Sequence, residues 1–194
     1  MATLKFVRQI KDTKLLLLGI VEEGESATYT VGIDTYENIG SISVGEFVDE
    51  ATLVSIKYAD EYIRAKKKAL NILAFADNNR RQLTDKLRRA GFSREIAQEI
   101  CEEMVLLGYV NELRQLEIIV LNEANIKLRG PVKIMAALSA KGYSSRDIRT
   151  AISNLTERGE LDFKRNAELL LEKKMTSGDE DEKKKILYKN GYLK

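Results

Sequence analysis

The chain has 194 residues and a nearly balanced charge, with 32 lysines and arginines against 30 aspartates and glutamates. It contains no histidine and a single cysteine, Cys101. These counts exclude a histidine-based catalytic triad, a histidine-ligated metal ion and an intramolecular disulfide. Cys101 follows Ala97 and Ile100 on the apolar side of a predicted helix. We therefore interpret it as a small buried residue rather than a nucleophile.

Residues 1–33 have the pattern of β-strands separated by tight turns. Leu4 and Phe6 alternate with polar neighbours, residues 14–21 form a β-rich run, and residues 29–33 alternate again. This pattern predicts a small antiparallel sheet of three strands. Because so few strands are barely stable alone, we expect the sheet to pack on the first helices.

The longest apolar run, residues 15–21, is far shorter than the roughly 20 residues that a membrane-spanning helix needs, so we expect no membrane partner. Residues 34–48 predict a short helical turn and a loop, and Asp49 is a candidate helix N-cap. The β-rich segment is therefore assigned to an N-terminal extension, residues 1–48.

Helical periodicity begins after Asp49 and defines a first predicted repeat, residues 49–110. Its long first helix ends near Asn79, which can cap a second helix over residues 80–90, and a third follows over residues 94–107. The positions predicted to face inward from the second helix are Leu83, Leu87 and Ala90.

A second predicted repeat covers residues 111–160 and contains the only proline, Pro131. Proline suits the first position of a helix, where its missing N–H costs nothing. Gly142 predicts a left-handed C-cap for that helix, and either Ser144 or Ser145 can cap the next one. The first helix, over about residues 112–125, has a predicted apolar stripe of Leu113, Leu116, Val120 and Ala124.

One phrase recurs along the chain at intervals of about 50 residues: a leucine, three residues, a glycine and an aromatic residue. Its copies are Leu87–Phe92, Leu138–Tyr143 and Leu187–Tyr192, and Gly108 and Gly159 follow the first two copies at the same offset. The aromatic residues after Gly91 and Gly142 are predicted to pack on the helix that ends there. The sequence thus predicts a mainly α chain of tandem three-helix repeats with a small N-terminal antiparallel β-sheet.

The third predicted repeat, residues 161–194, is truncated. Phe163, Ala167, Leu170 and Leu171 are predicted to face inward from its first helix. Ser177-Gly178-Asp179 predicts a loop and an N-cap for a last helix that runs to about Asn190. Because no third helix follows, the chain either ends on a shortened repeat or is a fragment.

Basic residues concentrate at matching places in the repeats. They crowd the middle helix of each repeat, whereas the flanking helices are acidic. Stacked repeats could align them into a stripe that binds phosphates or an acidic protein groove, although each charge could also lie on an ordinary solvated face. The candidate partner- or DNA-binding residues are Arg80, Arg81, Lys86, Arg88, Arg89, Lys127, Arg129, Lys133, Lys141, Arg146 and Lys184.

Nothing in the sequence predicts catalysis. It has no glycine-rich phosphate loop and no nucleophile elbow. The acidic run from Asp179 to Glu182 is best explained as charges that complement the N-terminus of a helix. We therefore expect no catalytic residue, metal, cofactor or small-molecule substrate.

The segment from Lys127 to Tyr143 reads K-L-R-G-P-x-x-I-x-x-x-L-x-x-K-G-Y and resembles the central motif of the RecX family, the bacterial regulators of the RecA recombinase. Residues 69–92 are similar to the first repeat of that family, and residues 167–192 to its third. The sequence departs from the family pattern at Asn78-Asn79 and Gln82-Leu83 within the first repeat, at Asn111-Glu112, which opens the second, and in the third repeat, which stops short.

The resemblance implies a cytoplasmic, non-enzymatic protein of tandem three-helix units that binds RecA or the RecA–DNA filament. It also implies modulation, usually inhibition, of recombinase and co-protease activity in DNA repair and the SOS response. The alternative is a helical-repeat protein that binds DNA without RecA through its basic helices. The direction of the effect on RecA, the binding face and the oligomeric state remain open at this level.

Overall fold

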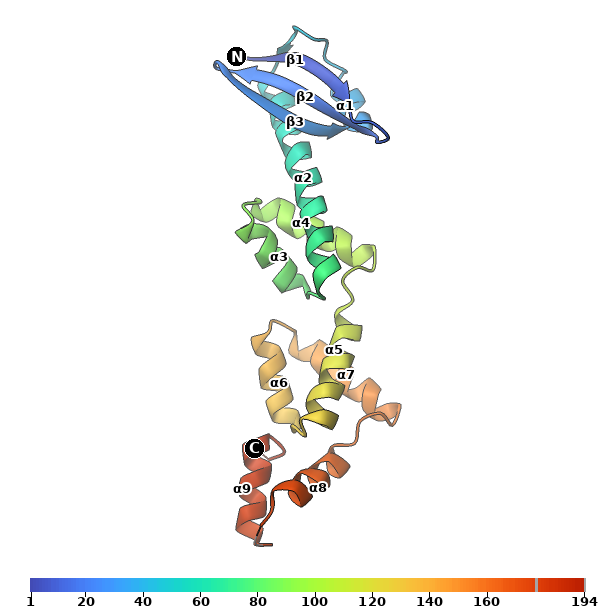
Figure 1. Ribbon diagram of the computed structural model, residues 1–194, viewed down its shortest axis with the longest axis vertical. Helices are drawn as coiled ribbons and strands as arrows, with labels where there is room; N and C mark the ends of the chain where they lie inside the picture. The colour runs from blue at the N-terminus through green and yellow to red at the C-terminus, as the bar shows by residue number, and fades with distance from the viewer. Residues whose placement is uncertain (177, 194) are drawn as a thin grey trace. The chain divides into compact units, whose positions relative to one another are not determined.

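The computed structural model describes residues 1–176 and 178–193. The chain divides into two compact units, one of residues 1–76 with 83–104 and one of residues 77–82 with 105–194. The fold is mainly helical, with a small antiparallel sheet at the N-terminus, as the sequence predicts (Figure 1).

The sheet in the first unit has four strands, one more than predicted. They are β1 (Ala2–Gln9), β2 (Leu15–Glu22), β3 (Glu25–Gly32) and β4 (Phe47–Val48), in the order β3-β2-β1-β4. The paired strands are antiparallel. The sequence did not predict β4, because a strand of two residues is too short to show the alternating pattern of a β-strand. The predicted helical turn before it is α1 (Ile33–Asn38).

One face of the sheet packs on the start of the long helix α2 (Glu50–Phe75), which Asp49 caps by accepting a hydrogen bond from the N–H of Thr52. Leu53 and Ile56 of α2 join the sheet residues Leu18 and Ile20 in one buried core. This packing supplies the support that an isolated small sheet would lack.

The first unit also holds most of the first repeat: α2, α3 (Arg80–Arg89) and α4 (Arg94–Leu106). Leu83 and Leu87 are fully buried, and Cys101 is buried as predicted. Ala90, by contrast, is exposed and the prediction for it was wrong, because α3 ends at Arg89 and Ala90 lies in the turn that follows.

The second repeat consists of α5 (Glu112–Leu121), a π-helical turn η1 (Asn122–Ile126), α6 (Pro131–Ala140) and α7 (Ser145–Glu157). Pro131 occupies the start of α6 as predicted. Of the two serine candidates, Ser144 caps α7 by accepting a hydrogen bond from the N–H of Asp147 at 3.1 Å.

Leu113 corrects the predicted stripe of α5. Leu116, Val120 and Ala124 are fully buried, but Leu113 is 39% exposed. It lies in the first turn of α5, ahead of the residues that enter the core of the repeat, and it lines a groove instead.

The third repeat contains α8 (Phe163–Lys174) and α9 (Glu180–Asn190). Leu170 of α8 is buried as predicted, whereas Phe163, Ala167 and Leu171 are only half-buried. Asp179 caps α9 by accepting from the N–H of Asp181, and Ser177 of the predicted loop lies outside the described residues.

The recurring glycines have the same backbone structure in all three copies. Gly91, Gly142 and Gly191 have φ of 94°, 94° and 83°, in the left-handed region. In each copy the N–H of the next aromatic residue donates to the leucine carbonyl at the start of the phrase, at 3.3, 3.2 and 3.0 Å. These helix-ending turns confirm the repeat. The repeat boundaries 49–110, 111–160 and 161–194 stay a prediction, because the two compact units divide the chain differently.

Leu138 is 1% exposed in the core of the second repeat, so Leu138→Ala should lower the free energy of unfolding by about 2–5 kcal/mol. Urea denaturation measures this loss. Leu106→Ala is the control, because Leu106 is 87% exposed and should change stability little. A loss no greater than the control's would contradict the assigned core.

Candidate partner-binding surface

The second unit contains a junction where α9 ends against the start of α6. The N–H of Gly130 donates to the carbonyl of Asn190 at 2.8 Å, and the N–H of Val132 donates to that of Gly191 at 3.1 Å. A Cβ on Gly130 would stand 2.3 Å from the Gly191 oxygen, so only glycine allows this approach. Two helices are thus joined end to end through backbone groups (Figure 1).

The other end of α6 meets the first turn of α3, which belongs to the same compact unit. The side-chain amide of Asn79 donates to the carbonyl of Lys141 at 3.0 Å, and the side chain of Arg81 lies against Gly142. Asn79 also caps α3 as predicted, accepting from the N–H of Gln82 at 2.8 Å. The end of α6 therefore packs on the start of α3 much as the end of α9 packs on the start of α6.

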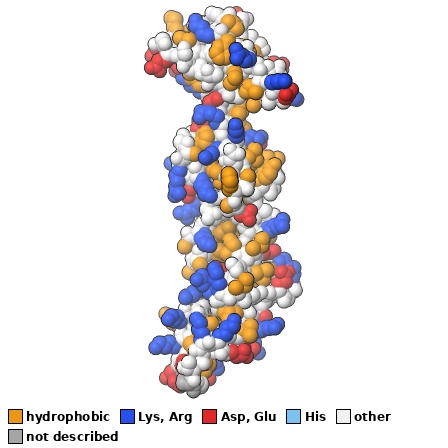
Figure 2. Space-filling model, viewed as in Figure 1, with side chains coloured by type: hydrophobic (Ala, Val, Ile, Leu, Met, Phe, Trp, Pro, Cys, Tyr) orange, Lys and Arg blue, Asp and Glu red, His pale blue; other side chains and the backbone are white. Residues whose placement is uncertain are grey.

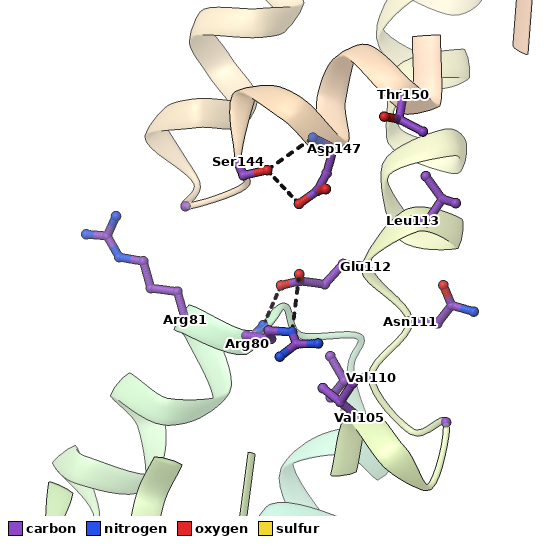
Figure 3. A pocket seen from close by; sticks show the side chains of 12 residues that line it. Arg80, Arg81, Val105, Val110, Asn111, Glu112, Leu113, Ser144, Asp147 and Thr150 are labelled. Carbon is purple, nitrogen blue, oxygen red and sulfur yellow. Dashed lines mark hydrogen bonds and ion pairs between the residues drawn. The ribbon is translucent and has the colours of Figure 1, made fainter. Parts of the chain in front are cut away.

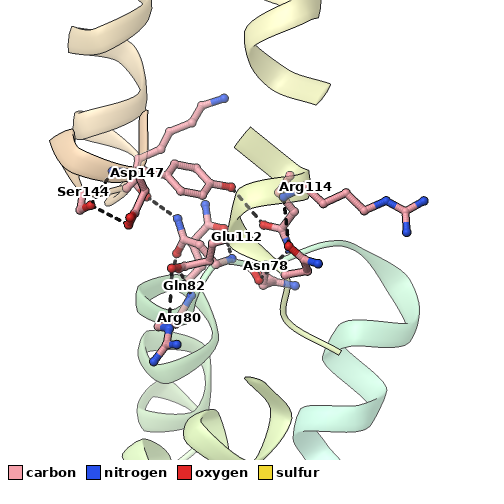
Figure 4. Close-up of polar contacts among 12 residues, drawn as sticks. Asn78, Arg80, Gln82, Glu112, Arg114, Ser144 and Asp147 are labelled. Carbon is pink, nitrogen blue, oxygen red and sulfur yellow. Dashed lines mark hydrogen bonds and ion pairs between the residues drawn. The ribbon is translucent and has the colours of Figure 1, made fainter. Parts of the chain in front are cut away.

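A buried polar cluster closes this second junction (Figure 4). Tyr143 donates to the Gln115 side chain at 3.1 Å, and Gln115 donates to the carbonyl of Asn78 at 3.2 Å. Burial of the Tyr143 ring raises the pKa of its hydroxyl. The sequence analysis missed Gln115, because a glutamine in an amphipathic helix gives no signal of a tertiary partner.

Of the eight predicted basic residues of the second unit, Arg81 lies against Gly142, and the other seven fall into two groups. Lys127 and Arg129 both bind the carboxylate of Glu123, whose side chain is only 8% exposed. Arg80 pairs with Glu112, which also accepts the backbone N–H of Arg80 at 2.7 Å. These three cations have structural partners inside the unit.

The second group is exposed: Lys133 on α6, Lys141 at its end, Arg146 on α7 and Lys184 on α9. Among the residues that the structure describes, none of these four side chains takes part in an ion pair. Figure 2 shows basic side chains gathered over the region of α6 and α9. We define Lys133, Lys141, Arg146 and Lys184 as the basic surface.

A groove of about 750 Å³ opens beside the junction of α6 with α3 (Figure 3). Arg80 and Arg81 line one side, Ser144 and Asp147 another, and Leu113 is among its apolar residues. The hydroxyl of Ser144 donates to the Asp147 carboxylate at 2.6 Å. The groove mixes cations, carboxylates and apolar side chains, which suits a protein segment better than a bare phosphate chain.

The remaining predicted residues, Lys86, Arg88 and Arg89, lie on the part of α3 that belongs to the first unit and are exposed. Arg88 and Arg89 line a shallow hollow of about 610 Å³ together with Phe92 and Arg94. They belong to the other unit and are not part of the basic surface.

Among residues 1–176 and 178–193, no cluster of acidic residues and cysteine could hold a metal ion. No described helix has the length and apolar character to cross a membrane.

Tandem three-helix units with glycine-closed turns define the class of this protein. The family model for the first three-helix domain of RecX matches residues 65–104. The regulatory protein RecX of Clostridioides difficile is 30% identical over 149 residues, which are 77% of this chain and 68% of that protein. The regulatory protein RecX of Bacillus cytotoxicus is 22% identical over 178 residues, which are 91% of this chain and 65% of that protein.

Solved structures agree on the fold. A crystal structure of a regulatory protein RecX superposes with a TM-score of 0.69 at 18% identity, covering 97% of this chain and 92% of that one. The crystal structure of RecX from Lactobacillus salivarius superposes with a TM-score of 0.58 at 24% identity, covering 70% of this chain and 90% of that one. The chain belongs to the RecX family of regulatory proteins. It spans about two thirds of the length of the curated relatives from Clostridioides and Bacillus.

Charge reversal should separate the two groups of cations. Arg129→Glu places a carboxylate beside the buried Glu123 and should lower the free energy of unfolding by about 1–3 kcal/mol. Lys133→Glu, the matched control on the basic surface, should change it by less than about 0.5 kcal/mol. Urea denaturation of both variants measures the difference, and equal losses would contradict a structural role for Arg129.

Glu123 should also make stability depend on pH. Burial by itself raises its pKa, but Lys127 and Arg129 outweigh burial and hold the pKa below the usual value of 4.5. A carboxyl whose pKa is lowered by folding stabilises the fold above its unfolded pKa, and this contribution is lost as the pH falls below about 4.5 through the folded value. Glu123→Gln should therefore lose less stability than the wild type between pH 5 and pH 3, roughly the window of carboxyl titration. Parallel pH titrations of the urea midpoint would show this, and identical slopes would exclude it.

Proposed function

We propose that this chain is a non-enzymatic regulator that binds the RecA recombinase, alone or as the RecA–DNA filament. It modulates, and most often inhibits, recombinase and co-protease activity during DNA repair and the SOS response in the cytoplasm. Membership of the RecX family is the observation that carries this proposal. The effect needs no catalytic residue, because binding along a filament is enough to alter its activity.

The geometry of the second unit supports this function. End-to-end junctions hold α9, α6 and the first turn of α3 in sequence, so cations on these helices keep fixed spacings. A filament repeats its own surface at fixed intervals, and a rigid array of charges can match such a surface at several points. The basic surface and the groove at Arg81 are the contacts proposed for RecA.

Binding to RecA should depend on the basic surface. The triple variant Lys133→Glu, Lys141→Glu and Arg146→Glu should reduce the effect of the chain on RecA strand exchange at least tenfold in half-effective concentration. Its helical circular dichroism should not change, because these residues are exposed and have no described ion pair. Arg129 is left intact in this variant because it holds Glu123.

The control reverses three exposed cations of α8, Lys164, Arg165 and Lys173, for the same total change of charge. It should retain the wild-type effect on RecA. If the wild type neither binds cognate RecA nor changes its strand exchange, the proposed function is wrong. If both triple variants weaken the effect equally, net charge rather than the basic surface is responsible.

The second candidate function is DNA binding without RecA. The hollow lined by Arg88, Arg89 and Arg94 favours it, because closely spaced arginines suit phosphate oxygens. Duplex DNA binding that falls steeply as salt rises, and that is lost on Arg88→Glu with Arg89→Glu, would establish this alternative.

A further inference from the structure

The N-terminal sheet has one face that α2 does not cover, and the strand registers define it. Pairing of Phe6 with Gly19 and of Arg8 with Leu17 places these residues opposite to the buried Leu4, Leu18 and Ile20. We call this the outer sheet face; it comprises Thr3, Phe6, Arg8, Leu15, Leu17, Gly19, Val21, Ser26, Thr28, Thr30 and Phe47.

Two exposed aromatic rings lie on the outer sheet face. The ring of Phe6 lies directly on Gly19, where a Cβ would stand 2.1 Å from a ring carbon, and Phe6 is 41% exposed. Phe47 of β4 pairs with Thr3 and is 59% exposed, while its neighbour Val48 points into the core. Phe6 and Phe47 are diagonal neighbours on adjacent strands, a relation that spans roughly 7–8 Å.

Aromatic rings in this arrangement are costly to leave in water unless something covers them. The bulge between Leu4 and Phe6 turns Phe6 onto the outer face, because a regular strand would place it beside Leu4 in the core. In other sheets, β-bulges change the direction of side chains at binding sites in the same way. Gly19 then supplies the flat surface on which the Phe6 ring rests.

The charge of this face is one-sided. No carboxylate occupies any of the described strand positions that form it, whereas Arg8 lies on it at 6.0 Å from the Phe6 ring and Lys5 stands exposed at the bulge. The strand carboxylates Glu22 and Glu25 pair with each other at register positions of the opposite face, and Glu22 binds Lys57 of α2 at 2.7 Å. Glu46, next to Phe47, accepts the N–H of Ser43 within its own loop at 2.7 Å. Figure 2 shows apolar and basic side chains over the N-terminal sheet, with acidic side chains at its edges.

We propose that the outer sheet face binds single-stranded DNA, with bases stacked on Phe6 and Phe47 and phosphates held by Lys5 and Arg8. Exposed aromatic rings on a four-stranded sheet can stack two or three unpaired bases, and stacking tolerates any sequence. Paired bases cannot reach such rings, which excludes a duplex as the occupant. The choice of DNA over RNA rests on the proposed function, since a RecA–DNA filament presents DNA strands.

Fluorescence anisotropy of the full chain with a labelled thymidine oligonucleotide of about 12 residues, without RecA, tests the proposal. Phe6→Leu and Phe47→Leu should each weaken binding about fivefold or more, since stacking stabilises each base by at least about 1 kcal/mol. The control Phe75→Leu removes an aromatic ring that is 92% exposed at the end of α2 and should bind like the wild type.

Lys5→Gln with Arg8→Gln removes two phosphate contacts and should reduce the slope of log K against log salt by about 1.4. Phe47 is the decisive position if Phe6→Leu unfolds the sheet, because Phe47 does not cover a glycine; circular dichroism and the urea midpoint report folding. Unchanged affinity of a folded Phe47→Leu variant, or absence of binding by the wild type, overturns the proposal. Tighter binding of an RNA of equal length, of duplex DNA or of an acidic peptide overturns the assigned ligand.

The two proposals fail independently. The double variant Phe6→Leu, Phe47→Leu should lose oligonucleotide binding and keep its direct interaction with DNA-free RecA, measured by pull-down. Loss of that RecA interaction in the folded double variant would instead place the RecA contact on the sheet. It would overturn the assignment of RecA to the basic surface and of single-stranded DNA to the outer sheet face.

Discussion

The hydrogen bonds between the start of α6 and the end of α9 are the constraint on which the second unit depends. They join backbone to backbone, from Gly130 and Val132 to Asn190 and Gly191. The N-terminus of α6, the positive end of its dipole, meets the C-terminus of α9, the negative end of its dipole, so the junction is electrostatically favourable. Because the contact uses main-chain atoms, it requires glycine at two positions and leaves the outward side chains free to vary. Backbone hydrogen bonds, rather than side-chain contacts, thus hold the two helices that carry Lys133 and Lys184 of the basic surface.

The motif from Lys127 to Pro131 is a structural element more than a binding one. Lys127 and Arg129 neutralise the buried Glu123, Leu128 is buried between them with a left-handed backbone, and Gly130 meets the next repeat. Pro131 starts α6. A motif can therefore identify a family without marking its ligand. The cations of the basic surface, none of which takes part in an ion pair within the described part of the chain, lie downstream of this motif: Lys133, Lys141, Arg146 and Lys184.

The two units present different chemistry. The basic surface of the second unit has exposed cations on α6, α7 and α9 and suits an extended partner with acidic groups. The outer sheet face of the first unit has aromatic rings, hydroxyls and Arg8, with Lys5 at the adjoining bulge, which suits unpaired bases. The function proposed for this chain would use both kinds of contact, one for the protein and one for the nucleic acid.

The sequence by itself determined the helices, their caps and the repeat, because these depend on local signals: Pro131, the serine and asparagine caps, and glycines with positive φ. It also located the basic residues of the candidate site. Only the tertiary structure decided which of these basic residues are held in ion pairs, since the partner of Arg80, for example, is the distant Glu112. The tertiary structure also corrected the prediction that Leu113 is buried. Leu113 lies on the same side of α5 as Leu116 and Val120, but the first turn of α5 lies outside the core, so its side chain is exposed. β4 and the outer sheet face likewise depended on pairing between distant segments, because strand register and the direction of Phe6 are set by the β-bulge and not by local propensity.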